Sequence, residues 1–193
     1  KPRTVGLTLV RDPGFGLQTL RALLETAAPF IDYAKMRNIT PRLFPESLLV
    51  EKIALYREHQ IELLFGGIVF EAAYLQEKVG QAIAYASRLG VKTVEISDNI
   101  ITLSIEDKLD FVRRYLDAGI EVLYEWGKKY PTGPLDPAQA ADEIARLLAL
   151  GVSRVMISVM TRVKRSEPPP AAVWTTNSIG LEGKGWRAAD LPQ

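Results

Sequence analysis

The chain has no cysteine and only one histidine among its 193 residues. It can therefore form neither disulfides nor thiolate metal sites, and this composition fits a reducing compartment. No apolar run approaches the roughly 20 residues that a membrane-spanning helix needs. Lys and Arg (24) nearly balance Asp and Glu (23), so the net charge gives no electrostatic case for nucleic-acid binding. We expect a cytoplasmic protein that binds neither membranes nor nucleic acids.

A helix, a tight stop and a short apolar strand recur along the first part of the chain. Gly90, Gly119 and Gly151 each follow an apolar helical stripe and precede a strand-like run, and they lie 29 and 32 residues apart. This period is typical of βα units, which form parallel sheets with functional residues at the carboxyl ends of the strands. The pattern predicts an α/β fold with a parallel, TIM-barrel-type sheet.

Six βα units can be counted in this pattern. The expected strands cover residues 4–10, 30–35, 61–65, 93–96, 120–124 and 152–157. The expected helices cover 17–27 and 74–89, or open at Pro45, Ser104 and Asp136, where capping residues mark a start. Residues 158–193 contain Pro168-Pro169-Pro170 and no helical stripe. We therefore expect a barrel-like domain over 1–157 and an irregular tail over 158–193.

Two carboxylates stand out because they lie in or at the end of otherwise apolar strands. Glu95 and Glu125 would each cost several kcal/mol if buried without a partner. A lysine or a metal ion would offset that cost, and ligands made only of oxygen favour Mg²⁺ over zinc. The two residues are the first candidates for a functional site.

Other polar residues at strand exits have a structural explanation as well as a functional one. Lys35 could pair with a neighbouring carboxylate, and Asp98 could cap a turn. Gly66-Gly67 could be a tight turn or could hold an anion with its N–H groups. Lys128 and Lys129 could be a solvated pair. Each signal is weak by itself.

Five runs of residues are more informative together than each is alone. They are Gly6-Leu7-Thr8, Ile31-Asp32-Tyr33-Ala34-Lys35, Gly66-Gly67-Ile68-Val69-Phe70-Glu71, Val94-Glu95-Ile96-Ser97-Asp98 and Val122-Leu123-Tyr124-Glu125-Trp126-Gly127-Lys128-Lys129. Over about residues 1–157 the chain resembles the phosphosulfolactate synthase family, which adds sulfite to phosphoenolpyruvate on the route to coenzyme M or sulfolactate. The fourth and fifth runs are the most specific parts of this resemblance.

The resemblance implies a (β/α)₈-type barrel and a Mg²⁺-dependent carbon–sulfur lyase. Attack of sulfite on C3 of phosphoenolpyruvate leaves a carbanion at C2, which must be held and then protonated. The implied Mg²⁺ ligands are Glu95, Asp98 and Glu125, and the implied proton donor is Lys128 or Lys129. Lys35 and Gly66-Gly67 would then bind the anionic groups of the substrates. We also expect a homo-oligomer.

The chain departs from the family pattern at several loops. Met36 to Pro41 replace a glycine-rich run, Ile68 replaces a threonine, and Asn99 replaces a glycine. The run from Ile157 to Met160 lacks the family's glutamate and arginine, and the last two βα units do not appear. Two alternatives therefore stay open: a non-catalytic relative with a binding or stress-related role, and a barrel enzyme that acts on another small carboxylate or phosphate.

Overall fold

The computed structural model describes residues 6–128, 136–158 and 173–176. Its strands are all parallel and pair in sequence order, with each strand beside the next one along the chain. They are β1 (Leu9–Asp12), β2 (Tyr33–Met36), β3 (Glu62–Phe65), β4 (Thr93–Ser97), β5 (Glu121–Trp126), β6 (Arg154–Ser158) and β7 (Val173–Thr176). Within the described residues β1 and β7 are the two edges, so the sheet is an open, curled half-barrel. The predicted fold class is confirmed.

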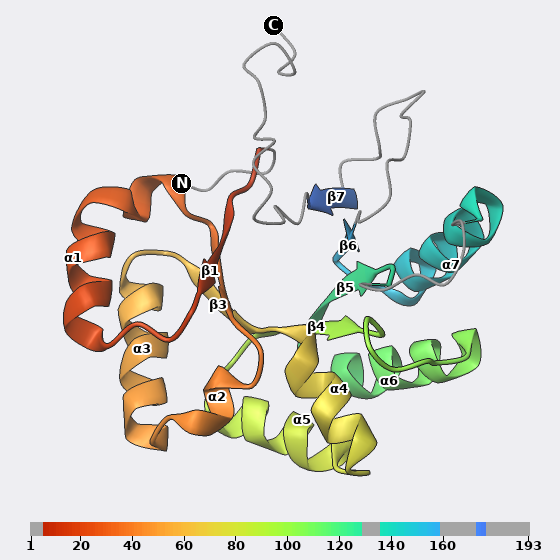
Figure 1. Cartoon of the computed structure of the whole chain (residues 1–193), viewed down its shortest axis with the longest axis horizontal. Coiled ribbons are helices and arrows are strands. Elements are labelled where there is room, and N and C mark those ends of the chain that lie inside the picture. Colours follow the sequence, from red (N-terminus) through yellow and green to blue (C-terminus); the bar gives the residue numbers. More distant parts are fainter. Residues whose placement is uncertain (1–5, 129–135, 159–172, 177–193) are drawn as a thin grey trace, which may run out of the picture.

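Helices follow the strands and lie around the outer side of the curved sheet (Figure 1). They are α1 (Leu17–Ala27), α2 (Thr40–Leu43), α3 (Glu46–Glu58), α4 (Gly67–Leu75), α5 (Val79–Arg88), α6 (Ile105–Asp117) and α7 (Pro137–Leu150), with a 3₁₀ turn, η1 (Ala28–Phe30). Ser104 and Asp136 cap α6 and α7 as predicted, because their side chains accept hydrogen bonds from first-turn N–H groups. No helix in the described part of the chain is both long and apolar enough to cross a membrane.

Several expected boundaries differ from the structure. The first strand, expected over 4–10, is Leu9–Asp12, and Gly6 before it has a φ of 63°, which is not extended backbone. The second strand begins at Tyr33 rather than residue 30, because η1 with its Pro29 precedes it. The helix expected over 74–89 is two helices, α4 and α5, separated at Glu77, whose φ of 58° is incompatible with a continuing right-handed helix. The segment expected to be an irregular tail contains a short strand, β7, parallel to β6. Ser158, the first residue of that segment, belongs to β6, whereas residues 159–172 and 177–193 lie outside the described residues, as do residues 129–135.

The two faces of the sheet have different neighbours because side chains alternate along each strand. The outward face carries the main core, for example Ala34, Phe65, Ile96 and Val122, which pack with the helices. A second, smaller apolar cluster contains Leu64, Leu123 and Met156. By strand register Lys35 pairs with Leu64, Glu95 with Leu123, and Glu125 with Met156. The three charged residues therefore share the inner face of the half-barrel.

Candidate active site

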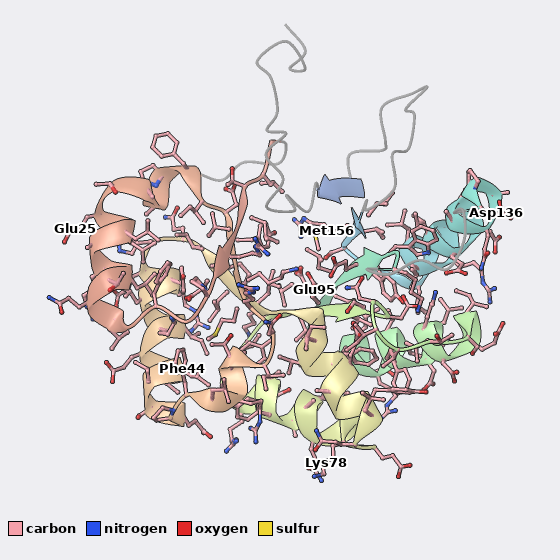
Figure 2. The ribbon with its side chains drawn as sticks, viewed as in Figure 1. Glu25, Phe44, Lys78, Glu95, Asp136 and Met156 are labelled. Atoms are coloured by element: carbon pink, nitrogen blue, oxygen red, sulfur yellow. The ribbon has the colours of Figure 1, made fainter. Side chains whose placement is uncertain are left out.

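Lys35 and Glu95 form an ion pair across the carboxyl end of the intervening strand β3. Lys35 Nζ lies 2.7 Å from Glu95 Oε2, and the two side chains are 14% and 2% exposed. Gly66, just after β3, lies beneath the lysine, because a Cβ there would be 3.5 Å from both Lys35 Cγ and Cδ. Figure 2 shows Glu95 near the middle of the molecule, where the strands converge. Two residues that are 60 positions apart in sequence thus meet at the predicted edge of the sheet.

Gly67 completes the surroundings of Glu95. Its N–H donates to Glu95 Oε1 at 2.8 Å, and a Cβ at Gly67 would lie 2.1 Å from Ser97 Oγ. Only glycine therefore lets α4 approach β4 this closely. Burial raises the pKa of Glu95 to about 7, with Glu125 adding to the rise while Lys35 opposes it. The N–H of Gly66 donates to Met36 O, so both glycine N–H groups expected to bind an anion have partners within the protein.

Glu125 lies on the other side of Lys35 and contacts Asn99. Lys35 Nζ is 4.0 Å from Glu125 Oε2, and Asn99 Nδ2 donates to the same oxygen at 2.8 Å. Asn99 is 3% exposed, and its Oδ1 is buried with no hydrogen-bond partner among the described residues. An unpartnered buried carboxamide oxygen is uncommon and marks a place where a ligand or ion could be accepted.

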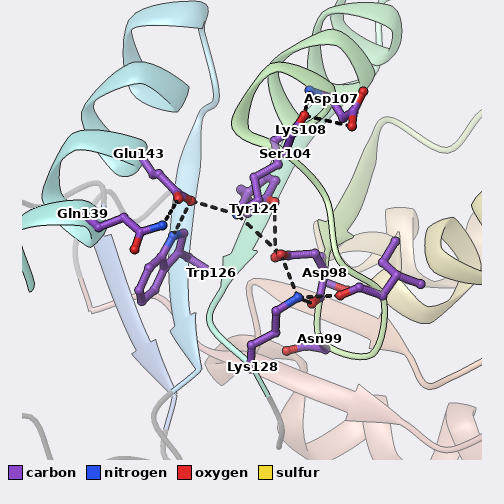
Figure 3. Close-up of polar contacts among 12 residues, drawn as sticks. Asp98, Asn99, Ser104, Asp107, Lys108, Tyr124, Trp126, Lys128, Gln139 and Glu143 are labelled. Atoms are coloured by element: carbon purple, nitrogen blue, oxygen red, sulfur yellow. Dashed lines mark hydrogen bonds and ion pairs between the residues drawn. The ribbon is translucent and has the colours of Figure 1, made fainter. Parts of the chain in front are cut away.

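Lys128 is held by the segment that follows β4. Its Nζ donates to Asp98 Oδ2 at 3.0 Å and to the backbone carbonyls of Asp98 and Ile101. These three acceptors match the three hydrogens of an ammonium group. Figure 3 shows the lysine beside Asp98, with Asn99 next to it. Lys129, the other expected proton donor, lies outside the described residues.

Asp98 belongs to a second polar network, which faces the helices rather than the inner face of the sheet. Its Oδ2 is 3.4 Å from Lys108 Nζ of α6, which in turn lies 2.7 Å from Glu143 Oε2 of α7. Glu143 also accepts hydrogen bonds from Trp126 and Gln139 (Figure 3). Although burial acts to raise the pKa of Glu143, these hydrogen bonds and that from Lys108 lower it. The network fixes α6 and α7 to the ends of β4 and β5.

The three residues expected to bind Mg²⁺ are thus divided between two groups. Ser97 and Glu125 pair in register on the inner face, so Asp98, one residue further on, points to the other side. No group of three or more His, Cys, Asp or Glu side chains is positioned to hold a metal ion in the described segments. Glu95, Glu125 and the free Asn99 Oδ1 still offer the oxygen donors that Mg²⁺ prefers.

Glu71 is a buried residue whose role sequence reasoning did not identify. It lies on α4 and is 0% exposed, and its carboxylate accepts hydrogen bonds from the segment just after β4. Two sequence signals mark it: it is a polar residue at the exit of the third strand, and it falls within one of the runs that carry the family pattern. Neither signal indicates its hydrogen-bond partners. The segment around it was expected to be a strand exit rather than a helix.

Other polar features lie away from this group. Asp12, at the end of β1, forms a fully buried ion pair with Lys52 of α3 and accepts the N–H groups of Gly14 and Phe15, so it orders its own loop. A groove of ≈ 520 Å³ lies among Arg42, Ala72 and Tyr85 on the helices. None of the strand-end candidates that the structure describes lines it.

Comparison with known proteins identifies the family. Residues 1–162 match the sequence model of the family described as (2R)-phospho-3-sulfolactate synthase (ComA). The chain belongs to the phosphosulfolactate synthase family. It is 33% identical over 159 residues to the phosphosulfolactate synthase of Methanothermobacter thermautotrophicus, covering 81% of this chain and 62% of that protein. It is also 33% identical over 126 residues to the enzyme of Methanocaldococcus jannaschii, covering 65% of this chain and 50% of that one.

The chain therefore spans between half and two thirds of the length of these two curated relatives. Among solved structures it is similar to 3-hexulose-6-phosphate synthase from Salmonella typhimurium, with a TM-score of 0.52. That match covers 79% of this chain and 64% of the other at 10% identity. At this identity the likeness concerns the fold alone, and it agrees with a partial TIM barrel.

Proposed function

We propose that this protein is a phosphosulfolactate synthase, which joins sulfite to phosphoenolpyruvate. The observation that carries the proposal is the meeting of Lys35, Glu95 and Glu125 at the carboxyl ends of β2, β4 and β5. Lys128 is bonded to Asp98, and the next residue, Asn99, donates to Glu125. In parallel barrels the catalytic groups lie at this edge of the sheet. Family membership supplies the choice of reaction.

Both substrates are anions, so the site must provide positively charged groups that stay in place although carboxylates lie beside them. Lys35 and Lys128 supply two ammonium groups, each fixed by a short contact to a carboxylate, Glu95 or Asp98. A lysine fixed in this way keeps its charge in place when a substrate enters. Under the proposal Lys35 contacts the carboxylate or phosphate of phosphoenolpyruvate, and Lys128 lies near the carbon that receives the proton.

The reaction balances with a single proton. The sulfur lone pair of sulfite forms the bond to C3, and the C2=C3 electron pair moves to C2, where the neighbouring carboxylate stabilises it. Lys128 then gives a proton to C2. To reach the substrate, its ammonium group breaks one of its hydrogen bonds to the backbone carbonyls of Asp98 and Ile101. No bond to phosphate breaks, so the product keeps the phosphoryl group and gains a sulfonate.

The proposal includes Mg²⁺, which Glu95, Glu125 and Asn99 Oδ1 would hold. When bound, the ion would offset the negative charge that develops on the substrate carboxylate. The chain's own contribution is to keep these oxygens in place, with Gly67 N–H on Glu95 and Asn99 Nδ2 on Glu125.

The test follows the ³¹P NMR signal of phosphoenolpyruvate mixed with sulfite, Mg²⁺ and the full chain. We expect phosphoenolpyruvate to give a new phosphorylated product only when sulfite, Mg²⁺ and the chain are all present. Lys128→Ala should lower turnover by at least about 100-fold, the usual contribution of a positioned acid. Lys92→Ala is the matched control, because Lys92 is exposed and lies before β4, at its amino end.

Two outcomes would count against the proposal in different ways. If phosphoenolpyruvate raises the melting temperature but no product forms, the chain binds the substrate without catalysis and the synthase proposal is wrong. If another phosphorylated acid is converted while phosphoenolpyruvate is not, the same scaffold serves a different reaction.

A further inference from the structure

The buried carboxylate of Glu71 is surrounded by hydrogen-bond donors from one short segment. Its Oε1 accepts from the hydroxyl of Ser97 and from Asn99 N at 3.1 Å. Its Oε2 accepts from Ile100 N at 2.9 Å and from Ile101 N at 3.2 Å. Three successive N–H groups that converge on one anion stabilise its charge. Among the described residues Glu71 has no lysine or arginine partner, so these donors alone offset its burial.

The same segment, which we name the 98–101 turn, also binds two residues of the candidate site. Its carbonyl groups at Asp98 and Ile101 accept from Lys128 Nζ, and its Asn99 side chain donates to Glu125. The N–H groups of the turn are therefore bound to Glu71, while its carbonyls hold the lysine. Glu71 itself touches neither Lys128 nor Glu125 through any hydrogen bond within the described structure.

We propose that Glu71 is a positioning residue that fixes Lys128 and Glu125 through the 98–101 turn. Without the carboxylate the three N–H groups would lose their acceptor, and the turn could no longer hold the two carbonyls at the distance that Lys128 requires. The expected effect on catalysis rests on the proposed function. The expected effect on the turn and on Lys128 does not, so the two can be tested separately.

The variant is Glu71→Gln, which keeps the shape of the side chain. The glutamine has one carbonyl oxygen, and its NH₂ group would face N–H donors, so only part of the bonding can be retained. Ser97→Ala is the graded comparison, because it removes the hydroxyl donor and leaves the three N–H bonds. Asp32→Asn controls for a general loss of stability. Asp32 is also a buried carboxylate, and it accepts a hydrogen bond from Thr8 N at 2.8 Å. It precedes β2, at the opposite end of the sheet from the 98–101 turn.

Two measurements need no activity. Hydrogen exchange at the amides of Asn99, Ile100 and Ile101 should accelerate in Glu71→Gln by about tenfold or more, the factor expected for the loss of about one net hydrogen bond each. Acylation of Lys128, followed by mass spectrometry under conditions that modify each lysine at most once, should also rise by about tenfold. Ser97→Ala should give smaller changes, and Asp32→Asn should leave both rates near those of the unaltered chain.

The third measurement is turnover with phosphoenolpyruvate and sulfite. In Glu71→Gln we expect kcat to fall by about tenfold or more with a KM that changes less than about threefold, because the lysine is misplaced while substrate binding remains. Faster amide exchange without a change in Lys128 acylation would overturn the proposal, and so would an equal response in Asp32→Asn. An unaltered chain without synthase activity but with the expected exchange and acylation results would refute the proposed function and leave the positioning role standing.

Discussion

Lys35 Nζ lies 2.7 Å from Glu95 Oε2, although the two residues belong to strands separated by β3. The contact is made over Gly66, where any side chain would lie against the lysine stem. The cation therefore stands between Glu95 and Glu125, its second carboxylate neighbour at 4.0 Å. This arrangement makes the stability of the half-barrel depend on the same charges that the proposed function uses.

Replacement of Lys35 by methionine should destabilise the protein because it leaves Glu95 buried without its cation. We expect a loss of about 3 kcal/mol in the free energy of unfolding near pH 8, typical of one broken buried pair. Adding Glu95→Gln to Lys35→Met should restore most of the loss. Urea denaturation of the two single variants and the double variant measures this. Additive effects of the two substitutions would show that the pair is not coupled.

The pH dependence of stability should carry a signature of Glu95. Its pKa in the folded protein is raised by burial to about 7, above the ordinary value of 4.5 that applies in the unfolded chain. Between these values the folded state keeps a proton that the unfolded state loses, so the stabilising contribution is complete below about pH 4.5 and is lost as the pH rises through about 7. Each unit of pKa elevation corresponds to about 1.4 kcal/mol.

Relative to Glu95→Gln, the unaltered protein should therefore lose unfolding free energy between about pH 5 and about pH 8. Denaturant titrations at both pH values test this. A difference between the two proteins that stays constant over the range would mean that Glu95 is ionised throughout.

Gly67→Ala should be strongly destabilising, because the new Cβ would lie 2.1 Å from Ser97 Oγ and 3.2 Å from Glu95 Oε1. Helix α4 would have to move away from β4, and the bond from Gly67 N to Glu95 would lengthen. We expect a loss of about 2 kcal/mol or more. Gly80→Ala in α5 is the matched control, because its Cβ would have room, 3.9 Å from Arg114 Nη2. That change should stabilise the helix by about 0.5 kcal/mol. Thermal unfolding distinguishes the two signs.

The sequence predicted the sheet well because parallel strands alternate with helices at a regular period, and glycines such as Gly90 and Gly119 mark the end of a helix before the next strand. It also predicted that Glu95 would need a cation, since a carboxylate in an apolar strand has few other ways to be stabilised. No local sequence pattern shows that this cation is Lys35 or that its side chain passes over Gly66, because both depend on the directions of side chains in the folded protein.

The position of Asp98 shows where the strand alternation could have been used further. Glu95 and Ser97 lie on the inner face of the sheet. Because side chains alternate along a strand, Asp98 had to point to the outer face, toward Lys108 and Tyr124. The partners of Glu71 could not be predicted, because the sequence pattern did not indicate a separate helix over 67–75, which is what directs its side chain to the end of β4. Its partners are backbone N–H groups, which sequence patterns do not distinguish.

The pair of Asp12 and Lys52 provides a last prediction that is independent of the candidate site. Both side chains are 0% exposed, their charged atoms are 2.7 Å apart, and Asp12 also accepts from Tyr56. Lys52→Met would leave the carboxylate buried without its cation, so we expect a loss of about 3–5 kcal/mol in the free energy of unfolding. Arg88→Ala is the comparison, because the ion pair of Arg88 with Glu46 is exposed and should contribute less than about 1 kcal/mol. Urea denaturation measures both. Similar losses in the two variants would mean that burial of the Asp12 charge is not what makes Lys52 necessary.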